Sequence, residues 1–169
     1  MESTYINQIF ALIYVVIIFY AVVSDYVGTI IPNWCSIALV VEFLIYALMF
    51  LTMREFAWHL LLGVIVFAFG IGFYAFGWFG GGDVKLLTAV MLWAGPAKGL
   101  IFVLSMCAIG FVMADGLIIL RRVLKFFPNL FPNSALLRRP VAWAEEGAFP
   151  YGIAIGAGAL VIWPTIFFP

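Results

Sequence analysis

The residues of this sequence that could do chemistry are a few charged side chains set among apolar ones. Asp25 ends a long apolar run, and Asp83 lies between a run of glycines and another apolar run. A charge at the centre of a helix in lipid costs roughly 2.5–3.5 kcal/mol on insertion scales, so carboxylates near membrane depth are candidates for function. Two carboxylates that face each other can share one proton: one then draws a proton from water, and the other protonates a departing amine. The pair predicts hydrolysis of a peptide bond that needs neither a metal nor a covalent intermediate.

Other catalytic mechanisms find little support. The chain has one histidine and no Gly-x-Ser-x-Gly sequence, and its two cysteines, Cys35 and Cys107, lie far apart in apolar runs. We therefore expect no disulfide, no metal site and no cofactor. His59 follows Trp58 near the end of an apolar run, which is typical of the aromatic belt at a membrane interface.

The composition indicates that the surroundings of these residues are lipid. Of the 169 residues, 67% are hydrophobic and 9% are charged, and the mean hydropathy is +1.22. A soluble domain carries about 25% charged residues, so this chain cannot cover a globular surface with polar groups. The formal net charge is zero, and we expect no nucleic-acid partner.

Six apolar stretches could cross a membrane, which takes about 20 residues for roughly 30 Å of hydrocarbon. We expect helices at about residues 6–23, 34–51, 56–79, 84–94, 99–120 and 149–168, in a single domain that spans residues 1–169. The sequence thus predicts an all-α integral membrane protein, a bundle of about six transmembrane helices. The fourth stretch is short, about half a bilayer at roughly 1.5 Å per residue.

The basic residues indicate an orientation. Cytoplasmic loops carry an excess of Lys and Arg, and the segment 121–148 between the last two helices holds most of them. If all six helices cross, this loop shares its side with both Asp25 and Asp83. The basic residues on that side are Lys85, Arg121, Arg122, Lys125, Arg138 and Arg139, against Arg54 and Lys98 on the other. We therefore predict that both aspartates lie at the cytoplasmic face, provided that the short fourth helix crosses.

The glycines ahead of Asp83 have a physical use. Gly80, Gly81 and Gly82 lack a Cβ, so their backbone can take a positive φ and let another chain come close. Asp83 itself would lie at the N-terminus of its helix, where the helix dipole favours an anion.

Three motifs resemble those of the type IV prepilin peptidases, a family of GxGD-type membrane aspartic peptidases. Gly80-Gly81-Gly82-Asp83 resembles the GxGD signature. Asp25 precedes an Ile-Pro-Asn at the family's spacing, and a late Pro-Tyr-Gly looks like another family segment. In this sequence these are Ile31-Pro32-Asn33 and Pro150-Tyr151-Gly152. The motifs occur in the family's order along essentially the whole chain.

The resemblance implies that Asp25 and Asp83 are the catalytic pair and that Gly80 and Gly82 shape the site. Lys85 matches a lysine that often follows the family's second aspartate, and we expect it to supply a charge near the pair. The substrates implied are prepilins, whose short basic leader precedes a hydrophobic helix and is cut at the cytoplasmic face of the bacterial inner membrane. Many relatives are basic between the first aspartate and Ile-Pro-Asn, whereas residues 26–30 contain no Lys or Arg. A charge that orients substrate is therefore in doubt there.

The length of the chain is similar to that of the short, peptidase-only branch, which serves Flp-type (tight-adherence) pili. Larger members have a paired-cysteine domain that methylates the new pilin N-terminus, and no such cysteine pairs occur here. Two other functions remain open. Glu42 and Asp115 add carboxylates that a proton-coupled carrier could use, and a non-catalytic assembly protein of a secretion system would tolerate loss of either aspartate. The oligomeric state is also open.

Overall fold

The computed structural model describes residues 2–127, 138–146 and 149–168, and every regular element in these ranges is an α-helix. Four of the helices are long and apolar enough to cross a membrane, and α6 is a shorter apolar helix. The predicted all-α membrane protein is thereby confirmed. The helices are α1 (Glu2–Gly28), α2 (Asn33–Phe50), α3 (Met53–Ala75), α4 (Gly81–Phe126), α5 (Arg138–Glu146) and α6 (Tyr151–Phe167). Residues 128–137 and 147–148 of the expected cytoplasmic loop lie outside the described residues, and α5 lies between them.

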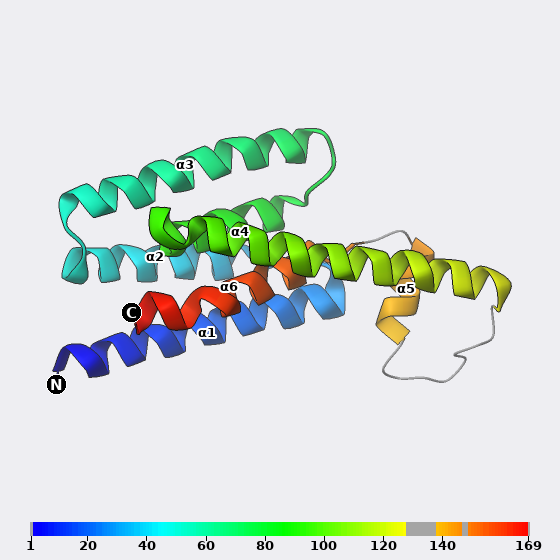
Figure 1. Ribbon diagram of the computed structural model, residues 1–169, viewed down its shortest axis with the longest axis horizontal. Coiled ribbons are helices and arrows are strands. Elements are labelled where there is room, and N and C mark those ends of the chain that lie inside the picture. The colour runs from blue at the N-terminus through cyan, green and yellow to red at the C-terminus, as the bar shows by residue number, and fades with distance from the viewer. Residues whose placement is uncertain (1, 128–137, 147–148, 169) are drawn as a thin grey trace.

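The 46-residue helix α4 consists of two arms that meet at Gly95. The backbone there is not helical, with φ 55° and ψ −169°, and Pro96 has no N–H to continue the first arm. Figure 1 shows the first arm (residues 81–94) running back beside α2 and α3, and the second arm (residues 96–126) returning past the start of the first. The expected helices at 84–94 and 99–120 correspond to these two arms.

Contacts between helices establish the direction in which each helix runs relative to its neighbours. The first arm of α4 runs parallel to α2 and antiparallel to α3, whereas the second arm runs antiparallel to α6, and α6 antiparallel to α1. The pairs are Asn33 with Lys85 and Leu39 with Trp93 (α2 and the first arm), Gly70 with Val84 and Gly63 with Leu92 (α3 and the first arm), Met106 with Gly158 and Gly110 with Ala154 (the second arm and α6), and Val22 with Gly156 and Asp25 with Gly152 (α1 and α6).

The reversal at Gly95 is held by His59 of α3. The carbonyl of Leu92 would accept a helical hydrogen bond from residue 96, but a proline cannot donate it. The His59 ring fills this role, with Nδ1 2.6 Å from the Leu92 carbonyl oxygen. Any side chain at position 95 would collide with the same ring. The sequence predicts an interfacial residue here; the structure gives His59 a structural contact that the pattern does not indicate.

Helix α3 ends at Ala75, before the expected boundary near residue 79. Gly77 has φ 73°, and the N–H of Trp78 donates to the Phe73 carbonyl at 2.9 Å. This is a Schellman motif, in which a glycine takes the left-handed conformation just after a helix. Residues 76–80 therefore form a turn that delivers the chain to the start of α4.

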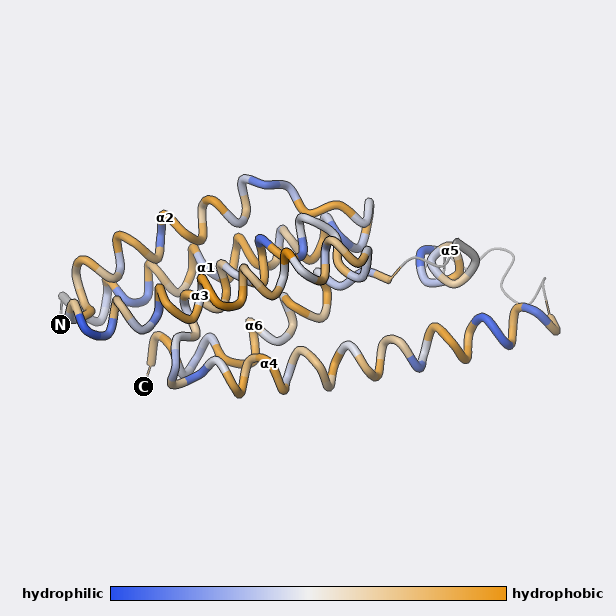
Figure 2. Tube along the Cα trace, turned by 90° about the horizontal axis from the view of Figure 1, so that it is seen from above, coloured by the Kyte–Doolittle hydropathy of each residue, from blue (hydrophilic) through white to orange (hydrophobic). Residues whose placement is uncertain are grey.

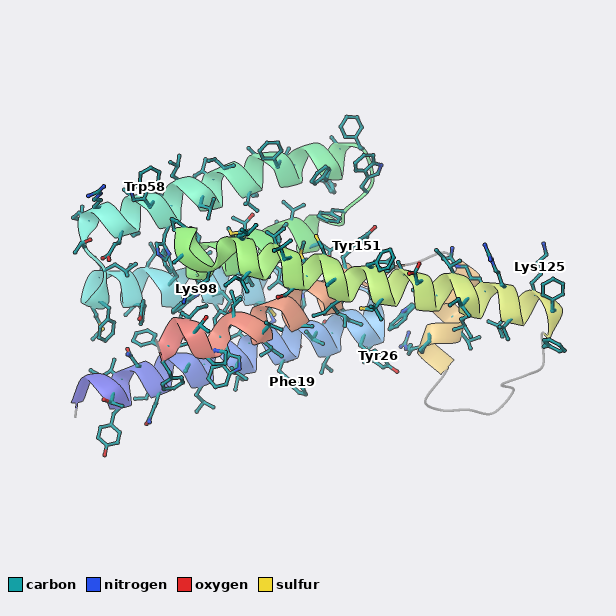
Figure 3. The ribbon with its side chains drawn as sticks, viewed as in Figure 1. Phe19, Tyr26, Trp58, Lys98, Lys125 and Tyr151 are labelled. Carbon is teal, nitrogen blue, oxygen red and sulfur yellow. The ribbon has the colours of Figure 1, made fainter. Side chains whose placement is uncertain are left out.

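The two ends of the bundle differ. Tyr26 and Tyr151 lie toward the end from which α5 and the far part of α4 project, whereas Trp58 and Lys98 lie toward the opposite end (Figure 3). Figure 2 shows that the long helices are apolar along most of their length and that hydrophilic residues concentrate in the far part of α4. We call the first end, where α1 finishes and α4 and α6 begin, the aspartate end.

Candidate active site

Asp25 lies in the last turn of α1 and is 3% exposed. Its Oδ2 accepts a hydrogen bond from the backbone N–H of Ile153 at 3.2 Å. Ile153 lies in the first turn of α6, where the N–H groups have no partner within their own helix. The carboxylate of Asp25 thus occupies the N-terminus of a neighbouring helix, a position that favours negative charge.

Asp83 lies in the first turn of α4, and its Oδ2 accepts a hydrogen bond from the N–H of Gly80 at 3.1 Å. As in a capping box, the side chain of the third residue of the helix accepts from the backbone N–H of the residue that precedes the helix. The prediction that Asp83 begins a helix is confirmed. Both aspartates therefore lie at helix N-termini, Asp25 at that of α6 and Asp83 at its own.

Ile31 connects the two aspartate segments. It is buried, and it lies against two glycines, Gly82 at the start of α4 and Gly152 at the start of α6, beside Asp25. A Cβ added at Gly82 would lie 3.1 Å from Ile31 Cβ and 3.2 Å from its carbonyl oxygen, and one added at Gly152 would lie 2.6 Å from Ile31 Cδ1 and 2.8 Å from Asp25 Oδ2. The first turns of α4 and α6 therefore pack against the same residue.

The glycines before Asp83 act differently from the sequence expectation. The positive-φ glycines of the described residues are Gly77 and Gly95, and Gly80 has φ −74°. What the site uses is the missing side chain. A Cβ at Gly80 would lie 2.9 Å from Asp83 Oδ2, so glycine there leaves room for the capping carboxylate.

Lys85 reaches toward α2. Its Nζ donates a hydrogen bond to Asn33 Oδ1 at 2.8 Å. The bond joins the first turn of α4 to the first turn of α2, so Lys85 anchors the segment that carries Asp83. The structure thus gives the lysine a partner that the sequence expectation of a nearby charge did not include.

Aromatic rings form one wall beside the aspartates. The rings of Phe79 and Tyr151 have centroids 4.8 Å apart, and Phe149 packs on the other side of Tyr151 at 4.5 Å. Phe79 directly precedes Gly80, and Tyr151 directly precedes Gly152. The wall therefore connects the loop before Asp83 with the helix start that binds Asp25.

The remaining acidic candidates lie elsewhere. Glu42 is buried near the middle of α2 with both carboxylate oxygens unpartnered among the described residues, as is the hydroxyl of Tyr14 on α1. Asp115 is exposed on the second arm of α4. Within the described residues no group of three or more His, Cys, Asp or Glu is placed to hold a metal ion, and both cysteines are free thiols.

Sequence reasoning missed the contribution of Ile31 and of the Ile153 N–H. The Ile-Pro-Asn and Pro-Tyr-Gly motifs indicated the two segments, but not that one buried side chain lies between them. A match to a sequence model of the type IV leader peptidase family covers residues 12–114 and so includes both Asp25 and Asp83. No curated protein and no solved structure matches the chain.

Proposed function

Because the chain belongs to the type IV leader peptidase family, we propose that it is a membrane aspartic endopeptidase that removes the basic leader from type IV prepilins. The observation that supports this most is the arrangement of Asp25 and Asp83. The carboxylates come from segments far apart in sequence, at the same end of the bundle and each at a helix N-terminus, and the glycines beside them, Gly82 and Gly152, both lie against Ile31. The whole of residues 1–169 would form the single transmembrane peptidase domain.

The proposed reaction is a direct hydrolysis. One aspartate, as the carboxylate, takes a proton from a water that attacks the scissile carbonyl carbon, and the other, as the acid, hydrogen-bonds to the carbonyl oxygen. The C–N bond of the tetrahedral intermediate then breaks, and a proton is delivered to the departing amine. Two helix N-termini favour the negative charge that the pair shares. Gly80 leaves room for the Asp83 carboxylate, and Gly82 lets the start of α4 pack closely on Ile31.

The substrate proposed is a Flp-like prepilin, with a short basic leader before an apolar helix. The active site would face the cytoplasm from the bacterial inner membrane, since the basic residues at the far end of the second arm of α4 (Arg121, Arg122 and Lys125) and those of α5 lie at the aspartate end. That is also the side on which a basic leader would remain during insertion.

The decisive experiment is cleavage of a co-expressed prepilin by the native chain and by Asp25→Asn and Asp83→Asn. Each variant is expected to lose cleavage by at least about 10²–10⁴-fold, the contribution of positioned acid–base groups. Because the carboxylates act as a unit, the double variant should be scarcely worse than either single one. Glu42→Gln, a change to a buried acid outside the site, serves as the matched control and should cleave normally. Near-native cleavage by either aspartate variant would remove that residue from the mechanism.

A proton-coupled carrier is a second candidate, favoured by one observation. Glu42 is 6% exposed, in the middle of a membrane-spanning helix, with no hydrogen-bond partner among the described residues. A carrier predicts that the chain moves protons across a liposome membrane and that Glu42→Gln stops this movement. Cleavage of prepilin that survives Glu42→Gln, with no proton flux in the native chain, would decide for the peptidase.

A further inference from the structure

An apolar groove runs along the second arm of α4 beside α6. Its volume is about 500 Å³, within the range of about 300–1,000 Å³ that binding clefts occupy. Phe111 at its edge is 68% exposed, so the groove opens sideways to the surroundings of the helix. It is lined by Phe79, Met106, Cys107, Gly110, Phe111, Ala114, Leu117, Ile118, Arg121, Phe149, Tyr151, Ala154 and Ile155.

The groove reaches the aromatic wall of the candidate site. Phe79 and Tyr151, the aromatic wall of the site, both line it. Because Gly110 lies against Ala154 and Gly152 lies against Asp25, the aspartates are level with a point just past Gly110. The part from Met106 to Gly110 therefore lies on the membrane side of the aspartates, and the part toward Arg121 lies beyond them.

The surface of α4 in the groove suits a second helix. Cys107, Gly110 and Ala114 recur at helical spacing, and small residues in this pattern let helix backbones approach closely in a membrane. Phe111 and Ile118 flank this strip with apolar side chains that are more than two-fifths exposed. An apolar helix laid here would bury them and would end at the aromatic wall.

A second groove provides a comparison. It has a volume of about 410 Å³ between α2 and α3, over the first arm of α4, and its polar lining includes Asn33, Ser36, Lys85 and Thr88. A basic leader approaching Asp83 from this side would meet the ammonium of Lys85, and like charges repel.

The first groove is also lined by a cation, Arg121, but a carboxylate lies beside it on the same helix. Asp115 is exposed and lies four residues after Phe111 and three before Ile118, on their side of the helix. Arg121 lies seven residues past Ala114, roughly 10 Å along the helix. Its guanidinium donates to the Trp143 carbonyl at 3.5 Å, so it is turned toward α5.

We propose that the groove between the second arm of α4 and α6 binds the apolar helix of the substrate, with the scissile bond at the Phe79–Tyr151 wall and the basic leader passing Asp115. The proposal rests on the proposed function, because it names the surface by which the same site selects a membrane-anchored substrate. The determinants of substrate choice would then lie on the second arm, and the catalytic carboxylates on other segments.

Photocrosslinking locates the occupant directly. A benzoylphenylalanine is placed at Phe111 in this groove, at Val41 in the second groove, or at Leu48, which is 89% exposed and lines neither. The chain carries Asp83→Asn so that the substrate, a basic segment followed by an apolar helix, stays intact. We expect crosslinks at Phe111 and none at Leu48. Crosslinks at Val41 in place of Phe111, or at none of the three positions, would overturn the proposal.

A matched pair of glycine variants measures the effect on cleavage. A Cβ at Gly110 has room, 3.6 Å from Ala154 Cβ, whereas nothing lies within 4 Å of a Cβ at Gly116. Gly110→Leu places a larger side chain in the groove and should raise KM for the membrane-anchored substrate about tenfold, since one extra methylene in a pocket already changes selection by about 10–200-fold. Gly116→Leu on the same helix should leave KM unchanged.

A short peptide that contains the leader and the cut site but no apolar helix serves as a second substrate. It distinguishes a loss of helix docking from a loss of folding or of catalysis. The rise in KM that Gly110→Leu causes should be much smaller for this peptide than for the membrane-anchored substrate. Equal losses on both substrates would overturn the docking proposal and leave the peptidase intact. If the native chain cleaves neither substrate, the proposed function itself fails, and the two failures are thus distinguishable.

Discussion

The two arms of α4 are both apolar helices, yet the bundle uses them in opposite ways. The first arm is buried almost throughout, whereas in the second arm the buried residues are Gly99, Phe102 and Leu117. The buried residues of the first arm, with the glycine that follows it, are Val84, Leu86, Leu87, Ala89, Val90, Met91, Leu92, Trp93, Ala94 and Gly95. The large exposed hydrophobic residues of the second arm are Leu100, Ile101, Leu104, Phe111, Val112, Ile118, Ile119 and Phe126.

The difference follows from what surrounds each arm. Trp93 of the first arm donates its indole N–H to the Leu39 carbonyl at 3.0 Å and packs on Tyr14 of α1 and Phe167 of α6 at ring distances of 5.5 and 5.1 Å. The second arm packs on α6 and, toward its far end, on α5, and its other side is exposed. In lipid, burial comes from close packing and not from avoidance of water. A fully packed arm can hold Asp83 in place, and a lipid-facing arm can receive another helix.

The difference in burial between the arms should show most strongly in the free energy of unfolding, measured after one leucine in each arm is replaced by alanine. Leu86 is 0% exposed and Leu100 is 70% exposed. Leu86→Ala should lower the free energy of unfolding by about 2–5 kcal/mol, because it leaves a cavity in a packed core. Leu100→Ala should change it by no more than about 0.5 kcal/mol, since it alters a lipid-facing surface. Reversible unfolding in mixed micelles measures both, and equal losses would show that the arms are packed alike.

The sequence allowed the fold class and the placement of both aspartates at one end to be predicted. Both follow from local properties: runs of apolar residues, their number, and the polar residues between them. The packing around each arm depends on residues far apart in the chain, such as His59 against Gly95 and Ile31 against Gly152. Hydropathy does not distinguish an arm buried by protein from one buried by lipid. For the same reason hydropathy alone does not explain the short length of the first arm, about 21 Å at 1.5 Å per residue. The helices packed around this arm do not show in a hydropathy pattern.

A smaller effect is expected where the arms meet. His59→Ala leaves the Leu92 carbonyl without a donor inside the bundle, which should lower the free energy of unfolding by about 1–3 kcal/mol. His59→Asn places an amide N–H near the position of Nδ1 and should restore part of the loss. The same unfolding measurement tests both. If His59→Ala and His59→Asn are equally destabilised, loss of ring packing against Phe43 and Gly95 explains the effect, and the hydrogen bond does not.

The smallest effect compares a glycine from each arm and is measured on catalysis. A Cβ at Gly82 would press on Ile31, including its backbone carbonyl at 3.2 Å, whereas one at Gly116 meets nothing within 4 Å. Gly82→Ala should displace Asp83 relative to Asp25 by a few tenths of an ångström and lower kcat about tenfold, since a misplacement of about 1 Å costs about 10²-fold. Because the groove on the second arm is unchanged, KM for the anchored substrate should stay the same. Gly116→Ala should keep native kcat and KM and add up to about 1 kcal/mol of stability through helix propensity. A raised KM with normal kcat in Gly82→Ala would mean that this glycine serves substrate binding and not the placement of the carboxylates, and the division of labour between the arms would then have to be redrawn.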